Sequence, residues 1–204
     1  MRLLDRLHGG FVHSRRVRVL CNELSLLLPR GARVLDVGSG DGLLASLVQS
    51  ARPDATVSGI DVLVRGDTRI PVTPFDGNRI PFEDQSFDVV MFVDVLHHTD
   101  DPAVLLREAA RVARSSIVIK DHRLEGPCAR PILTFMDWVG NARHGVSLPN
   151  NYWPERRWRE TFDTLGLAVG DWHTDLGLYP GLADRVFGGS LHFVARLQPG
   201  RSVA

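Results

Sequence analysis

Acids and glycines alternate in the segment VLDVGSGDG, residues 34–42. Glycine loses much conformational entropy on folding, and a carboxylate at the edge of a sheet must be solvated or paired, so a ligand is the expected reason for this cluster. A carboxylate such as Asp36 beside a glycine turn repels a pyrophosphate and attracts a sulfonium or an ammonium group. The segment therefore predicts a ligand that carries positive charge.

A dinucleotide site is the other common use of a glycine turn after a strand, and it requires the spacing G-x-G-x-x-G. Counting from Gly38, the second glycine is present at Gly40, but Leu43 stands where the third should be. The dinucleotide spacing therefore fails. Asp61, at the end of the next predicted strand, is placed to accept both hydroxyl groups of a ribose.

Strands that alternate with helices position these residues. Helical apolar spacing over residues 14–28 predicts a helix with Ser14 as its N-cap, and Asp101 followed by Pro102 opens another. β-rich runs predict strands at 33–37, 55–61, 87–95 and 115–121. This alternation is typical of a parallel α/β sheet.

Residues 70–77 predict a further strand at a sheet edge, because Pro71 and Pro74 cannot donate ladder hydrogen bonds. The connection from Asp61 to this strand is too short for a full crossover helix. After strand 115–121 comes a long insertion, and Pro154 then opens a helix. Two closing strands are predicted at residues 167–174 and 191–197.

The acid-glycine motif, Asp61, the FDG segment at 75–77 and the segment IPFEDQSFDVVMFVDVLHH occur in an order that resembles class I S-adenosylmethionine-dependent methyltransferases, in the small-molecule, methyltransferase type 11-like branch. The resemblance covers residues 30–121. It implies a Rossmann-like α/β fold with helices on both faces of a seven-stranded, mostly parallel sheet of order 3-2-1-4-5-7-6, strand seven antiparallel. It also implies a single domain over 1–204, with an N-terminal helix or lid at 1–30 and an acceptor-side insertion at 122–153.

The resemblance implies S-adenosyl-L-methionine as the cofactor and transfer of its methyl group to a small organic acceptor. A segment with Phe11, Val12, His13 and Arg16 would fold over that cofactor. The implied cofactor-binding residues are Asp36, Gly38, Ser39 and Gly40 in the glycine motif, Asp61 and Val62 at the ribose, Asp76 and Gly77 at the adenine, and Asp94 at the methionine moiety. The alternative is a non-catalytic cofactor-binding module on the same fold, towards which the short second crossover leans.

Methyl transfer needs a general base only when the acceptor retains a proton at neutral pH. Candidates follow the predicted strands, where parallel sheets place their ligands: His97, His122 and Asp121. His98 is expected to be a structural histidine bonded to backbone near Asp101, and His144 is a weaker candidate. No metal is expected, since adjacent residues rarely face one ion and no H-x-x-x-H spacing is present.

Aromatic residues of the insertion could wall a flat acceptor pocket, and ordinary packing of a cap is an equally good interpretation. They are Phe135, Trp138, Tyr152 and Trp153. The acceptor itself is left open.

Composition excludes several partner classes. The chain has 24 basic residues (Lys and Arg) and 24 acidic residues (Asp and Glu). The net charge is therefore zero, and no overall electrostatic field would attract nucleic acid or an anionic membrane. The sequence has no signal-peptide pattern and no apolar run of about 18 residues that could span a bilayer. Cys21 and Cys128 form no disulfide framework, so a cytoplasmic protein is expected, either monomer or homodimer.

Overall fold

The computed structural model describes residues 2–141 and 149–200, and in this part of the chain seven strands form one sheet. The strands are β1 (Arg33–Val37), β2 (Thr56–Asp61), β3 (Val72–Pro74), β4 (Phe87–Val93), β5 (Ala113–His122), β6 (Leu167–His173) and β7 (His192–Pro199). Their order is β3-β2-β1-β4-β5-β7-β6, and β7 runs antiparallel to β5 and β6 while the other neighbours are parallel. The strand order and the direction of the last strand are confirmed.

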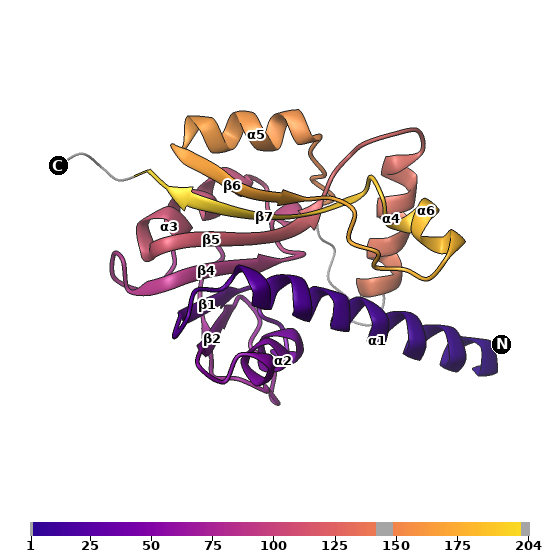
Figure 1. Ribbon diagram of the computed structural model, residues 1–204, viewed down its shortest axis with the longest axis horizontal. Coiled ribbons are helices and arrows are strands. Elements are labelled where there is room, and N and C mark those ends of the chain that lie inside the picture. Colours follow the sequence, from indigo (N-terminus) through magenta and orange to yellow (C-terminus); the bar gives the residue numbers. More distant parts are fainter. Residues whose placement is uncertain (1, 142–148, 201–204) are drawn as a thin grey trace.

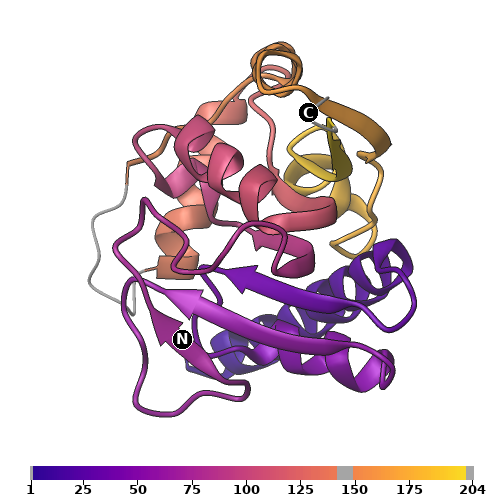
Figure 2. The same ribbon diagram turned by 90° about the vertical axis from the view of Figure 1, so that its left-hand side faces the viewer.

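Helices cover both faces of this sheet. They are α1 (Arg2–Leu27), α2 (Leu43–Ala51), α3 (Pro102–Val112), α4 (Ala129–Asn141), α5 (Glu155–Thr164), α6 (Leu182–Phe187) and the 3-10 helix η1 (Leu96–His98). Figures 1 and 2 show α1 and α2 below the sheet and α5 above it. No helix of residues 2–141 and 149–200 is long and apolar enough to cross a membrane.

The core is divided by the sheet into two layers. On β4, Val90 and Phe92 pack towards α3 and α5, whereas Val89 and Met91 pack towards α1 and α2. All four side chains are buried. Because both faces of this strand are covered, its sequence is continuously apolar from Val89 to Val93 instead of alternating.

The connections match most expectations. β3 is an edge strand, as its prolines predict, and the 62–71 connection contains no helix. α3 passes from Val112 directly into β5 at Ala113, which explains why no glycine turn precedes that strand. The helices α4 and α6 were not predicted.

The first helix differs from its prediction. α1 begins at Arg2, so Ser14 lies inside the helix and the prediction that Ser14 is its N-cap is wrong. The residues before Ser14 contain no proline, and glycines such as Gly9 and Gly10 weaken a helix by only about 1 kcal/mol each without blocking it. Helical structure can therefore continue upstream of a good capping residue.

The start of α3 provides a test of this local structure. The Asp101 Oδ1 atom accepts a hydrogen bond from the Ala103 amide at 3.0 Å, as an N-cap should. Replacing it, Asp101→Ala, is expected to lower the free energy of unfolding by about 1 kcal/mol in urea titrations. Asp100→Ala, which removes the same charge from the preceding residue, serves as the control. An equal loss in both variants would contradict the assignment of the cap.

Candidate active site

The glycine turn lies between β1 and α2, at the carboxyl end of the sheet. Gly38, Gly40 and Gly42 have φ values of 74°, 60° and 73°, a region that side chains disfavour. A Cβ on Gly38 would lie 2.6 Å from Val95 Cγ2, and one on Gly42 would lie 2.6 Å from Ile70 Cγ1. The turn thus requires glycine for both conformation and space.

Hydrogen bonds tie this turn to the end of β2. The amides of Gly38 and Ser39 donate to the Ile60 carbonyl at 2.8 and 3.2 Å. The Gly40 amide donates to Asp61 Oδ2 at 2.8 Å. Ser39 Oγ packs so closely on β2 that a Cβ at Gly59 would lie 2.3 Å from it. The structure therefore brings the residues of the glycine motif next to the predicted ribose-binding residue Asp61.

Asp36 is a buried carboxylate on β1, and no described residue donates a hydrogen bond to it. Burial raises the pKa of Asp36 from 3.8 to about 7, and the Asp61 carboxylate adds to this effect. Such a group is stabilised by a cation more than a solvated carboxylate is. The sequence-based expectation of a positive ligand thus has a physical basis in the fold.

The end of β2 also adjoins the loop that follows β3. A Cβ at Gly77, whose φ is 82°, would lie 3.2 Å from Val62 Cγ1. Asp76 is exposed, and its Oδ1 atom accepts from the amides of Asn78 at 2.8 Å and Arg79 at 2.7 Å. These amides lower the pKa of Asp76. Asp76 Oδ2 takes part in neither bond.

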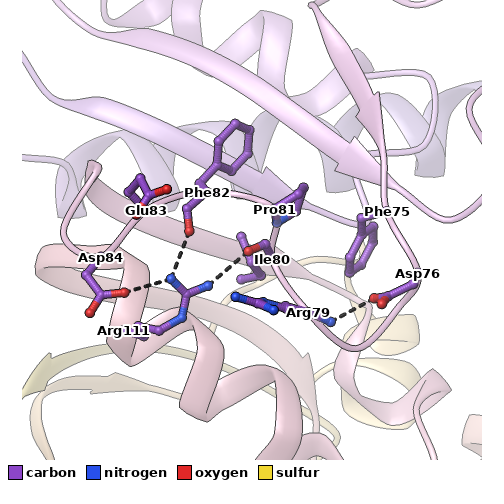
Figure 3. Close-up of a pocket in the computed structure, with 9 residues that line it drawn as sticks. All are labelled: Phe75, Asp76, Arg79, Ile80, Pro81, Phe82, Glu83, Asp84 and Arg111. Carbon is purple, nitrogen blue, oxygen red and sulfur yellow. Dashed lines mark hydrogen bonds and ion pairs between the residues drawn. The ribbon is translucent and has the colours of Figure 1, made fainter.

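A pocket of about 480 Å³ borders this loop (Figure 3). Its lining residues are Phe75, Asp76, Arg79, Ile80, Pro81, Phe82, Glu83, Asp84 and Arg111. Arg111 donates to Asp84 Oδ1 and to the carbonyls of Phe82 and Ile80 at 2.8 to 2.9 Å, so its charge is engaged within the protein. Of the predicted site residues, Asp76 alone lines this pocket.

Asp94, just beyond β4, is held between two cations. Arg16 from α1 donates to Asp94 Oδ2 at 2.5 Å, and the Lys120 ammonium from β5 donates to Oδ1. Burial alone would raise the pKa of Asp94, but the charges of Lys120 and Arg16 outweigh it and hold that pKa well below the usual range. Lys120 is fully buried, and burial lowers its pKa to about 8.

The catalytic candidates His97 and Asp121 form a buried pair. His97 Nδ1 donates to Asp121 Oδ1 at 2.5 Å, and both side chains are fully buried. Asp121 Oδ2 accepts from the Leu96 amide at 2.9 Å. Burial lowers the pKa of His97, but Asp121 and Asp137 outweigh this effect and raise it to about 9.

His122, the third candidate, is the last residue of β5 and lies between two acids. Its Nε2 atom is 3.5 Å from Asp94 Oδ1 and 3.9 Å from Asp137 Oδ1. Burial lowers the pKa of His122 well below 6.5, and Lys120 and His97 add to the shift. The ring therefore lies between the ion pairs of Asp94 and the ion pairs of His97, and it carries no charge at neutral pH.

The predicted acceptor-side aromatics separate into two groups. Phe135 and Trp138 are exposed on α4. Tyr152 is buried, stacks on His97 at 5.5 Å between ring centroids and donates its hydroxyl hydrogen to Asp137. Trp153 packs in the core against Trp158, with ring centroids 4.8 Å apart.

Trp153 is 2% exposed and belongs to the core cluster, which favours ordinary packing over an acceptor wall for this residue. The expected backbone bond of His98 is wrong, because its Nδ1 atom is buried without a hydrogen-bond partner in the described part of the chain. His144 and the side chains of Phe11, Val12 and His13 lie outside what the structure describes.

Four functional-looking residues were missed or undervalued by sequence reasoning: Arg16, Lys120, Asp137 and His192. Lys120 ends the apolar run IVIK, and a lysine in an otherwise buried strand is a usable signal. Asp137 and His192 carry no such signal, because their partners come from distant elements. His192 Nδ1 lies 3.3 Å from the Lys120 ammonium.

Comparisons with known proteins identify the family to which the chain belongs. A family model described as a methyltransferase domain matches residues 11–170. The chain is 34% identical over 138 residues to the 27-O-demethylrifamycin SV methyltransferase of Amycolatopsis mediterranei, covering 55% of this chain and 50% of that protein. It is 31% identical over 162 residues to an O-methyltransferase of Aspergillus nomiae, covering 63% of this chain and 70% of that one.

Among solved structures, a SAM-dependent methyltransferase from Aquifex aeolicus has the same fold, with a TM-score of 0.60 and 20% identity over 87% of this chain and 88% of that chain. The chain spans about half the length of the Amycolatopsis relative. The range matched by the family model, residues 11–170, includes the glycine turn, and the likeness to the solved structure concerns the fold.

The environment of Asp36 yields a prediction about stability. Since its pKa is higher in the folded than in the unfolded chain, the folded protein binds more protons between pH 4 and 7, and ionisation of Asp36 reduces stability as the pH rises through this window. Asp36→Asn is therefore expected to stabilise the protein at pH 8 by about 2 kcal/mol more than at pH 5.5. Urea unfolding of both proteins at both pH values measures this difference.

The matched control is Asp67→Asn, which changes an exposed acid in the connection after β2. It should alter stability equally at the two pH values. If Asp36→Asn also altered stability equally at the two pH values, the charge of Asp36 would be compensated by a partner in the folded protein, and the prediction would be wrong.

Proposed function

The chain belongs to the family of class I S-adenosylmethionine-dependent methyltransferase domains, and from this premise we propose that it methylates a hydroxyl group of a small organic acceptor. The observation that carries the proposal is Asp36, a buried acid without a compensating cation. It lies beside a glycine turn that is hydrogen-bonded to Asp61, and it favours a positively charged cofactor. The name of the Aspergillus relative, an O-methyltransferase, supports oxygen as the atom methylated.

The residues at the strand ends fit this cofactor. Asp61 presents a carboxylate with capacity beyond the two amides it accepts from, as a ribose diol requires. Val62 and Gly77 approach one another where an adenine edge would lie, with Asp76 next to them. Asp36, Gly38, Ser39, Gly40 and Asp94 complete the proposed cofactor-binding set.

Bound S-adenosylmethionine supplies an electrophilic methyl group on a sulfonium, which an acceptor oxygen takes by in-line displacement. The contribution of the protein is to hold the acceptor about 3 Å away and aligned, and to remove its proton. We assign proton removal to His122, because its ring is placed between Asp94 and Asp137. His97 and Asp121 position the surrounding groups.

Phe135 and Trp138, both exposed on α4, and Tyr152, beneath that helix, are proposed as the acceptor side. We further propose that the chain acts as one domain, with α1 closing over the cofactor through Arg16. The proposal that the chain is a catalyst competes with a non-catalytic cofactor-binding module.

The test is binding followed by turnover. Calorimetric titration with S-adenosylhomocysteine should show one site per chain, and incubation with S-adenosylmethionine and a panel of phenols and aliphatic alcohols should release S-adenosylhomocysteine. Binding without turnover on hydroxyl, amine and carbon acceptors alike would favour the non-catalytic alternative. Lack of binding would overturn the proposal.

Asp61→Asn is expected to weaken S-adenosylhomocysteine binding about tenfold or more, since a charge-assisted hydrogen bond is worth about 1.5–3 kcal/mol. Asparagine can still accept from the Gly40 amide, so the turn is retained. Calorimetry measures the change, with Asp67→Asn as the control in the same connection. Unchanged affinity in Asp61→Asn would remove Asp61 from the site.

His122→Gln is expected to lower kcat by about 100-fold or more, as loss of a general base does, and to leave the affinity for S-adenosylhomocysteine within about threefold. Steady-state kinetics on the identified acceptor, together with calorimetry, separates the two effects. His173→Gln, at an exposed histidine of β6, should change neither. A parallel loss of affinity and kcat in His122→Gln would indicate a structural role.

A further inference from the structure

Three potential metal ligands converge at the carboxyl end of β4, next to the glycine turn but outside it. One ring nitrogen of His97, one ring nitrogen of His98 and a carboxylate oxygen of Asp137 all lie within 4.8 Å of one another. The histidines come from η1 and the acid from α4, so the group joins the sheet to the insertion. Although His97 and His98 are adjacent in sequence, the tight turn of η1 directs both nitrogens to one place.

Both nitrogens lack a hydrogen bond. His97 Nε2 and His98 Nδ1 are buried, and neither has a hydrogen-bond partner among the residues that the structure describes. His97 Nε2 lies 3.4 Å from Asp137 Oδ2, an ion-pair distance without hydrogen-bond geometry. An unsatisfied buried polar atom costs about 1–3 kcal/mol, so two of them beside one carboxylate call for a shared partner.

The surrounding groups orient these atoms as the outer shell of a metal site does. His97 donates its other ring hydrogen to Asp121, whose carboxylate also accepts from the amides of Leu96 and His122. A carboxylate that fixes one ring nitrogen leaves the other free to bind a metal. Asp137 is held in turn by the Tyr152 hydroxyl.

We propose that His97, His98 and Asp137 bind a divalent transition-metal ion of the Zn²⁺, Mn²⁺ or Fe²⁺ type. Two imidazoles and one carboxylate suit these ions, whereas Mg²⁺ and Ca²⁺ prefer oxygen ligands alone. Zinc bonds of about 2.0–2.1 Å place ligand atoms roughly 3 Å apart, so the group contracts on binding. His98, which is half-buried, is the ligand with room to turn.

Three protein ligands leave coordination positions open for an acceptor oxygen. His122 Nε2 lies 3.9 Å from Asp137 Oδ1, so these positions adjoin the proposed base. This role at the acceptor rests on the proposed function, whereas binding of the metal does not. The competing occupant is a proton on His97 Nε2, which faces Asp137, while the Nδ1 hydrogen remains bonded to Asp121.

The experiment is a titration of the untagged full chain, stripped with EDTA, with Co²⁺ followed by Zn²⁺. One Co²⁺ per chain should produce visible d–d absorption, and Zn²⁺ should abolish it. His98→Gln and Asp137→Asn should each weaken Co²⁺ binding at least tenfold, and both leave the His97–Asp121 pair intact. His173→Gln, which removes an exposed histidine beside Glu23, should bind as the parent does.

Absence of Co²⁺ absorption in the parent at millimolar Co²⁺ would overturn the proposal, as would undiminished binding in both variants or its loss in His173→Gln. Circular dichroism in EDTA checks the folding of each variant. Should the variants unfold, paramagnetic shifts of the His97 and His98 ring protons in the parent decide the matter. Titration with S-adenosylhomocysteine in EDTA tests the cofactor site separately, so failure of one proposal is distinguishable from failure of the other.

Discussion

The charge of Asp94, a partly buried carboxylate just beyond β4, is the constraint on which the carboxyl end of the sheet depends. An ionised carboxylate inside a protein is tolerated only when cations and hydrogen bonds compensate it, and removing one partner leaves an uncompensated charge. Arg16 and Lys120 supply that compensation from α1 and β5, on either side of β4. The position of α1 on this face of the sheet is therefore supported by the charge of Arg16 as well as by its apolar contacts with the sheet.

Asp36 and Asp94 lie on neighbouring parallel strands, and their environments are opposite. Asp36 is buried without a compensating cation, and its pKa is raised to about 7. Asp94 is surrounded by two cations, and the pKa of this acid is lowered. The field around Asp36 therefore favours a positive group, such as the one that the proposed cofactor carries, whereas the charge of Asp94 is already compensated by Arg16 and Lys120.

Sequence reasoning succeeded where the signal is local. The glycine turn could be identified because its spacing and positive φ values concern consecutive residues, and the edge strand because Pro71 and Pro74 cannot donate hydrogen bonds. The pairing of His97 with Asp121 was out of reach, because it depends on the register of β4 against β5. Trp153 could not be placed either, since its burial follows from packing against Trp158.

The group formed by His97, His98 and Asp137 shows why the proposed acceptor side could not be predicted from the sequence. Asp137 lies in the middle of the insertion and Tyr152 at its end, and they meet over His97 only because α4 packs next to η1. The proposed cofactor side is made from turns next to the strands. The proposed acceptor side is made from contacts between the insertion and the sheet. The two halves of the site can therefore vary independently, and the choice of acceptor can change while the glycine turn and Asp61 stay the same.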